Sequence, residues 1–300
     1  MTATARPPRR TGVRLLGAHA ALVYAFFYAP IALLIVYSFS GDRLIGRWGG
    51  FSLEWYREFV ANEQLTGFHD GAIWTSLKVA AVSTIVSVVL GTLAALSLER
   101  FRYRGQRVFD ALLYLPIIIP DVTMGIMMLI FFAEGIEFMD TVFGLELSKG
   151  IATITVSHIA FNISFVSVVV RARLAGMDER LEEAAMDLYA SRWQTFRHVT
   201  FPQILPGVAG GALLALTLSL DDVVVTQFSA GPGSTTLPVF VFSLIRKGVT
   251  PMINAVSVVM LVASLGLIAL MLLAEGLRAG DGPPTEESGT PNDKADKMSA

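Results

Sequence analysis

The chain has 300 residues, of which 53% are hydrophobic and 16% are charged, and its mean hydropathy is +0.59. This composition is too apolar for a soluble domain and is typical of membrane proteins. The formal net charge of −2 does not indicate a nucleic-acid-binding protein, and the lack of cysteine excludes disulfides, zinc-thiolate sites and thiol nucleophiles.

Six charge-poor stretches have the length of about 20 residues that a helix needs to cross a bilayer. No small-x-small cleavage site follows the first of them before "SFSGDRLIGRW", so we expect a retained helix and not a signal peptide. The sequence therefore predicts an all-α membrane protein with six transmembrane helices. The predicted spans are 15–39, 77–98, 111–133, 151–170, 204–228 and 255–274.

Two polar tails flank the predicted transmembrane domain, which covers residues 15–276. The first tail, 1–14, is basic and contains proline, and the second, 277–300, has few apolar residues. Segments of this composition bury too little apolar surface to fold, so we expect both tails to be disordered.

Arginine falls in alternate loops, and the loops between them are acidic or mixed. Positively charged loops stay in the cytoplasm. The sequence therefore predicts that both termini are cytoplasmic. The arginines in question are Arg6, Arg9, Arg10 and Arg14 before the first span, Arg100, Arg102, Arg104 and Arg107 after the second, and Arg171, Arg173, Arg180, Arg192 and Arg197 after the fourth.

Three aspartates lie inside predicted spans: Asp121 in the third, and Asp221 and Asp222 in the fifth. A charged aspartate at the centre of a bilayer costs at least about 2.5–3.5 kcal/mol, so these acids should face the protein interior and serve a role. Counted along continuous helices, Asp121 lies near mid-membrane and Asp221 in the outer half. Adjacent residues point about 100° apart, so only one of Asp221 and Asp222 is expected to face a central path.

Other functions can also place acids in a membrane. An aspartyl protease dyad of Asp121 and Asp221 would need the Tyr-Asp and Gly-x-Gly-Asp signatures, and both are missing. A secondary transporter or channel would use the acids as proton relays or ion sites. We expect His19, His158 and Asn162 to form interhelical hydrogen bonds, and glycine in "GTLAALS" of the second span to allow close helix packing.

The cytoplasmic loop 171–203 contains two predicted short helices. Apolar residues at helical spacing define the first, which ends near Tyr189. Ser191 and Gln194 have the spacing of a capping box, so the second helix should begin at Ser191, and we expect it to end before Pro202. Periodicity alone also fits a helix that lies in the lipid headgroups.

The same loop resembles the EAA loop of ABC importer permeases. Glu183-Ala184-Ala185 is followed at the family spacing by Tyr189, Val199, Phe201 and Pro202, although Tyr189 stands where the family has glycine. If that position requires a left-handed backbone, tyrosine costs about 1–2 kcal/mol that glycine does not. The resemblance implies a coupling helix that docks in a cleft of an ATPase subunit. The coupling residues it implies are Glu182, Glu183, Ala184, Ala185, Leu188, Tyr189 and Pro202.

Two further stretches resemble the PotC and PotI type of permease from spermidine/putrescine ABC importers. They are "LPIIIPDVTMGIMMLIFF" in the third span and "LTLSLDDVVVTQFSAGPGSTTLPVFVFSLIRKGVTPMINA" from the fifth span onward. The resemblance implies a type I importer (MetI-like) permease fold in the cytoplasmic (inner) membrane of a bacterium. It also suggests, independently of the cost of burying these acids, that Asp121, Asp221 and Asp222 lie along a path for polyamines or another organic cation. Trp55 lies in the first outward loop, where anchoring at the membrane interface is the simpler role, and is a weaker candidate for cation-π contact.

The chain lacks the G-x-x-x-x-G-K-[ST] phosphate loop, so ATP should bind elsewhere. The resemblance supplies the partners: a second, PotB-like permease, two PotA-like ATPase subunits that bind ATP and Mg, and a PotD-like extracytoplasmic polyamine-binding protein. This chain itself is expected to need no cofactor and to perform no covalent chemistry.

Overall fold

The computed structural model describes the whole chain except residues 1–9, 45, 179, 249 and 281–300. Within the described residues the structure is helical, with one isolated antiparallel bridge between Ser40 and Phe51 and no extended strand. The all-α prediction is therefore confirmed. Most of the two predicted tails, 1–14 and 277–300, lies outside the described residues.

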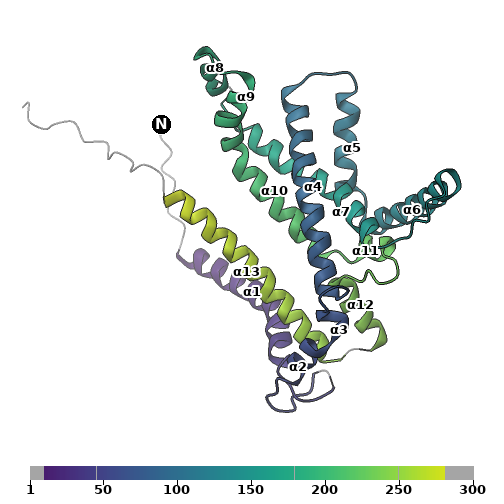
Figure 1. Cartoon of the computed structure of the whole chain (residues 1–300). Coiled ribbons are helices and arrows are strands. Elements are labelled where there is room, and N and C mark those ends of the chain that lie inside the picture. The colour runs from purple at the N-terminus through teal and green to yellow at the C-terminus, as the bar shows by residue number, and fades with distance from the viewer. Residues whose placement is uncertain (1–9, 45, 179, 249, 281–300) are drawn as a thin grey trace, which may run out of the picture. The chain divides into compact units, whose positions relative to one another are not determined.

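Five helical segments of the described chain are long and apolar enough to cross a membrane (Figure 1). They are α1 (Arg10–Tyr37), α4 (Ala72–Arg100), α6 (Asp121–Phe143), α7 (Ile151–Leu174) and the continuous segment Arg192–Asp221. The predicted sixth span falls within α13 (Met252–Gly280). The shorter elements are α2 (Glu54–Ala61), α3 (Glu63–Thr66), α5 (Gln106–Ile118), α8 (Arg180–Asp187), α9 (Arg192–Thr195), η1 (Phe196–Thr200), α10 (Phe201–Asp221), α11 (Val224–Ser229) and α12 (Leu237–Lys247).

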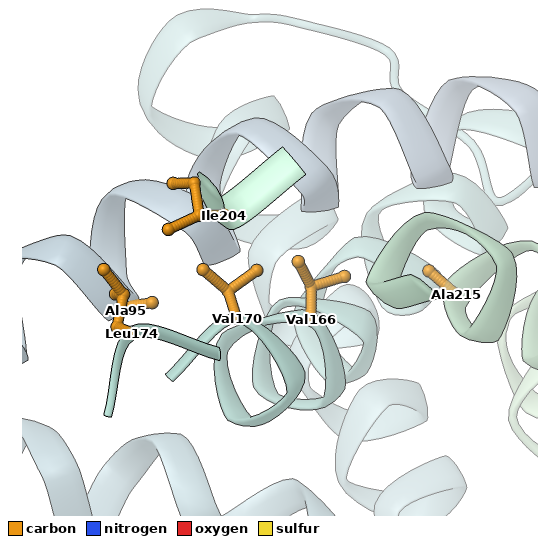
Figure 2. Packing of buried hydrophobic residues seen from close by; sticks show 6 residues of the cluster. All are labelled: Ala95, Val166, Val170, Leu174, Ile204 and Ala215. Carbon is orange, nitrogen blue, oxygen red and sulfur yellow. The ribbon is translucent and has the colours of Figure 1, made fainter. Parts of the chain in front are cut away.

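The core of the unit that ends at Ser257 is a bundle of α4, α7 and α10. Small and β-branched side chains fill it, as Figure 2 shows for Ala95, Val166, Val170, Ile204 and Ala215. A Cβ added at Gly91 would lie 2.8 Å from Val166 Cβ and 2.9 Å from Ile163 O, so α4 and α7 approach at a distance that only glycine permits. This confirms the packing role predicted for glycine in the second span.

Two predicted spans, 111–133 and 204–228, are interrupted in the structure. The third span divides into α5 and α6 at Pro120, which lacks an N–H and holds Ile119 in an extended conformation (φ −70°, ψ 132°). As a result α6 runs across the direction of α5 and does not continue it (Figure 1). The fifth span ends at Asp221, and after the extended residue Asp222 the chain begins again as α11.

The loop after α7 forms two helices, as predicted, but the second does not end before Pro202. The capping box is present: Ser191 N donates to Gln194 Oε1 (2.8 Å), and Gln194 N donates to Ser191 Oγ (3.3 Å). Helical structure then continues from α9 through the π-helical turn η1 into α10. Proline is tolerated here because the wider turn changes the hydrogen-bond register just before it, with Phe201 N donating to Phe196 O.

The close approach at Gly91 gives a first prediction. Gly91→Ala should destabilise the protein by about 1–3 kcal/mol, because the new methyl group overlaps Val166 and the carbonyl of Ile163. Gly135→Ala in α6 is the matched control: a Cβ there meets nothing within 4 Å, so higher helix propensity should leave stability equal or greater. Thermal melting of the purified protein measures both. Equal melting temperatures for the two variants would contradict the packing account.

Candidate functional site

Asp121 and Asp221 line one pocket of about 400 Å³, where α5, α6, α7, α10 and α11 meet. Apart from the acids its walls are largely apolar and include Met124, Phe161 and Leu218. Both aspartates are exposed in the structure, and neither forms an ion pair with a lysine or arginine among the described residues. The pocket therefore offers two carboxylates and an apolar surface to a ligand, a combination suited to an organic cation.

The break at Pro120 brings the two acids together. Because α6 begins at Asp121, this residue stands at a helix start and not in mid-helix as expected. One turn later Gly125 lets α6 pack against α11, since a Cβ at Gly125 would overlap the ring of Phe228. The expected difference in depth between Asp121 and Asp221 was counted along continuous helices, which the structure does not have, so it stays a prediction; the structure shows that both residues line one pocket.

Asp222 differs from its neighbour because its carboxylate is bonded within the protein. Oδ2 accepts the backbone N–H of Thr226 (2.6 Å) and the hydroxyl of the same residue (2.7 Å), and Oδ1 accepts the N–H of Val225 (3.3 Å). These bonds satisfy backbone donors at the start of α11, which have no partner inside that helix. Asp222 also lines the pocket, but its carboxylate is bonded at the break between α10 and α11, whereas Asp221 is exposed.

A buried histidine of α7 completes this arrangement. His158 Nδ1 lies 2.5 Å from Ser219 Oγ, and Nε2 lies 2.9 Å from Thr226 Oγ1 and 3.4 Å from Asp222 Oδ2. The predicted interhelical bonding is confirmed for His158. It is wrong for Asn162, whose side-chain N and O have no partner among the described residues. The sequence did not indicate which residues His158 bonds, because its partners lie 61 and 68 residues further along the chain.

Trp55 lies in α2 and does not line the pocket with Asp121 and Asp221. Its side chain is only 6% exposed, and Nε1 donates to the carbonyl of Ser40 at 2.7 Å. In this conformation the indole ring therefore anchors the loop after α1.

The coupling residues implied by the EAA resemblance divide into two groups. Glu182 Oε1 accepts bonds from Arg100 (2.7 Å) and Thr200 (2.6 Å), so it fastens α8 to the end of α4 and to η1. Glu183, Ala184 and Pro202 are exposed, and Ala185 is half-buried. Leu188 and Tyr189 are 82% and 98% exposed. Leu188 and Tyr189, together with Trp193, are exposed apolar side chains on α8, α9 and the turn between them. Figure 1 shows these two helices beyond one end of the bundle of α4, α7 and α10.

Tyr189 has φ 63° and is the non-glycine residue with positive φ in the described part of the chain. The position at which the resembling family has glycine therefore does adopt the left-handed conformation. The side chain gains no packing in return.

Arg171 joins three helices at the same end of the bundle. Its guanidinium pairs with Glu99 of α4 (2.7 Å) and with Asp110 of α5 (2.5 Å). Glu99 and Arg100 are adjacent, so the last turn of α4 binds both α7 and α8. The sequence predicted Arg171 only as part of a basic loop. It did not predict the ion pair with Glu99, because the two residues lie 72 positions apart and leave no local pattern.

Comparison with known proteins gives a consistent result. Residues 87–279 match the family described as "Binding-protein-dependent transport system inner membrane component". Over 272 residues the chain is 39% identical to the putrescine transport system permease protein PotI of Escherichia coli (strain K12), covering 90% of this chain and 92% of the relative. It is 37% identical over 270 residues to the spermidine/putrescine transport system permease protein PotC of the same strain, covering 90% and 96%.

Solved structures of ABC importers share the fold. A chain of a bacterial ABC transporter that imports the acidic polysaccharide alginate has a TM-score of 0.70 at 17% identity, covering 91% of this chain and 97% of that one. A chain of the MetNI methionine transporter has a TM-score of 0.54 at 20% identity, covering 69% and 94%. The predicted type I importer fold is thereby confirmed. The chain belongs to the family of binding-protein-dependent transport system inner membrane components, the permease subunits of ABC importers.

Proposed function

We propose that this permease forms, with a second permease subunit, the path by which an ABC importer carries polyamines across the bacterial cytoplasmic membrane. The observation that supports this most strongly is the pocket shared by Asp121 and Asp221. A polyamine is a chain of methylene groups with two or more ammonium groups. Its ammonium groups match the two carboxylates, and its methylene groups match walls such as Phe161 and Leu218.

The names of the relatives point to the same substrate class, since PotI and PotC are described as putrescine and spermidine/putrescine permeases. The partners that follow are a PotB-like second permease, two PotA-like ATPase subunits that bind ATP and Mg, and a PotD-like binding protein outside the membrane. In this proposal Asp121 and Asp221 receive the cation, and Asp222 shapes the site. A direct role of Trp55 in the path stays a prediction.

The second prediction tests the two carboxylates. Asp121→Asn and Asp221→Asn should each lower polyamine uptake about tenfold or more, because a loss of about 1.4 kcal/mol in transition-state stabilisation already reduces a rate by that factor. Asp140→Asn, an exposed acid near the far end of α6, should transport normally. Uptake into proteoliposomes, corrected for the amount of assembled complex, measures the effect. Wild-type rates for both pocket variants would refute the cation path.

The third prediction concerns orientation, for which we propose cytoplasmic termini on the basis of the arginine-rich loops. The chain has no cysteine, so single cysteines report cleanly. Thr141→Cys, exposed near the end of α6, should react in intact cells with a membrane-impermeant maleimide. Arg104→Cys, exposed between α4 and α5, should react only after the cells are opened. The reverse pattern would require the opposite orientation.

We also propose that the exposed surface of α8 docks in the ATPase subunit, with Glu183, Ala184, Ala185, Leu188, Tyr189 and Pro202 at or beside the contact. Exposed apolar side chains on the same side of the membrane as the basic loops indicate a contact with a partner protein. In this arrangement Glu182 serves the coupling indirectly, because its bonds to Arg100 and Thr200 fix how α8 is presented.

The fourth prediction concerns the turn at Tyr189. Tyr189→Gly should stabilise the turn by about 1 kcal/mol relative to Tyr189→Ala, because glycine adopts φ 63° without a steric penalty and alanine does not. Amide hydrogen exchange at residues 185–195 should be slower in the glycine variant. Equal exchange in the two variants would show that the left-handed turn is not strained.

A further inference from the structure

The break between α10 and α11 is crossed from outside by one side chain, His158 of α7. Its Nδ1 faces Ser219 on α10, and its Nε2 faces Thr226 on α11 and the carboxylate of Asp222 between them. The imidazole is fully buried and so are the two hydroxyl-bearing residues, with Ser219 at 4% and Thr226 at 0% exposure. Water therefore does not replace any of these contacts.

The hydrogen bonds of this network are consistent with one another. The hydroxyl of Thr226 donates to Asp222 Oδ2, so its oxygen is left to accept the N–H at His158 Nε2. With the imidazole neutral, His158 Nδ1 accepts the hydroxyl of Ser219, and the hydroxyl oxygens of Ser219 and Ser83 on α4 lie 2.8 Å apart. The network thus extends from α4 through α10 and α7 to the carboxylate of Asp222.

This hydrogen-bond network opposes the conformation that the local sequence favours. Residues 204–228 are apolar enough to read as one continuous helix, and along such a helix successive side chains turn by about 100°. Asp221 and Asp222 would then both move away from their present positions. The bonds to Asp222 and Thr226 hold the backbone at the break instead. The carboxylate of Asp222 is therefore bonded within the protein, and Asp221 lines the pocket with Asp121.

We propose that His158 is a positioning residue for transport: it clips α10 to α11 and thereby sets where the carboxylate of Asp221 stands in the pocket. The clip itself follows from the contacts of His158, whereas its consequence for polyamines rests on the function proposed above. His158 does not line the pocket, so it acts through Asp222 and Thr226 and not by touching the substrate.

Two substitutions of His158 separate the two halves of the clip. Glutamine places an amide nitrogen near the position of Nε2 and can keep the bond to Thr226 and Asp222, whereas asparagine reaches only the position of Nδ1 and keeps the bond to Ser219 alone. A third variant, Thr226→Val, removes one hydroxyl with little change in shape. The control is Ser157→Ala, which removes a buried bond of the same kind between α7 and α11 (to Ser229, 2.7 Å) that does not touch Asp222.

The first readout does not depend on transport. Val224 lines the pocket at the start of α11, so Val224→Cys in this cysteine-free chain reports the position of the break through its rate of reaction with a small charged methanethiosulfonate. In the assembled transporter we expect the rate to fall at least threefold with His158→Asn and with Thr226→Val. His158→Gln and Ser157→Ala should leave it close to the parent value.

The second readout is uptake at a saturating concentration of polyamine-loaded binding protein, in chains with Val224 intact. His158→Asn should reduce the maximal rate about tenfold, and His158→Gln should retain at least a third of it, at equal amounts of complex. Unchanged cysteine reactivity in both His158→Asn and Thr226→Val would overturn the clip, whatever happens to uptake. Altered reactivity with normal uptake would support the clip and refute the cation path instead.

Discussion

A helix that begins inside a membrane protein leaves its first backbone N–H groups without partners, and in a medium that excludes water the protein must satisfy them. At the start of α11 this requirement is met by Asp222, which accepts the N–H groups of Val225 and Thr226. The charge that would be costly as a free carboxylate thus stabilises the start of α11. The pocket depends on this interaction, because it allows the chain to stop being helical one residue after Asp221.

The helices that line the pocket also carry the loop that contains α8 and α9. The last turn of α4 holds α7 and α5 through Glu99, Arg171 and Asp110, and holds α8 through Arg100 and Glu182. Further along, Ser83 of α4 and His158 of α7 meet Ser219 of α10. Ion pairs therefore hold α5, α7 and α8 at the last turn of α4, and buried hydrogen bonds hold α7 and α10 beside the break further along the same helix. Mutations in both sets are the means to measure whether the two regions are coupled through α4.

The sequence predicted the helical class, the membrane location and the capping box of α9 because each depends on local composition or spacing. Its expectation that only one of Asp221 and Asp222 faces a central path stays a prediction: it was drawn from helix geometry, whereas Asp222 is extended and both residues line the pocket. It did not predict the breaks at Pro120 and Asp222. Both occur within apolar runs where hydropathy is uninterrupted, and the second depends on His158, a residue of another helix. The continuous helices from which the depths of Asp121 and Asp221 were counted are absent for the same reason, and the depths themselves stay a prediction.

The central claim is that the two helix breaks bring Asp121 and Asp221 into one pocket of the working transporter, and cross-linking tests it most directly. With Asp121→Cys and Asp221→Cys in the same cysteine-free chain, a short bifunctional methanethiosulfonate should join the two thiols in the assembled complex, and mass spectrometry of the linked peptides should detect the product. The pair Asp121→Cys and Asp140→Cys lies about 28 Å apart along α6 at 1.5 Å per residue and should not be linked. Efficient linkage of the first pair alone is the predicted result, and its absence when each thiol reacts singly would contradict the shared pocket.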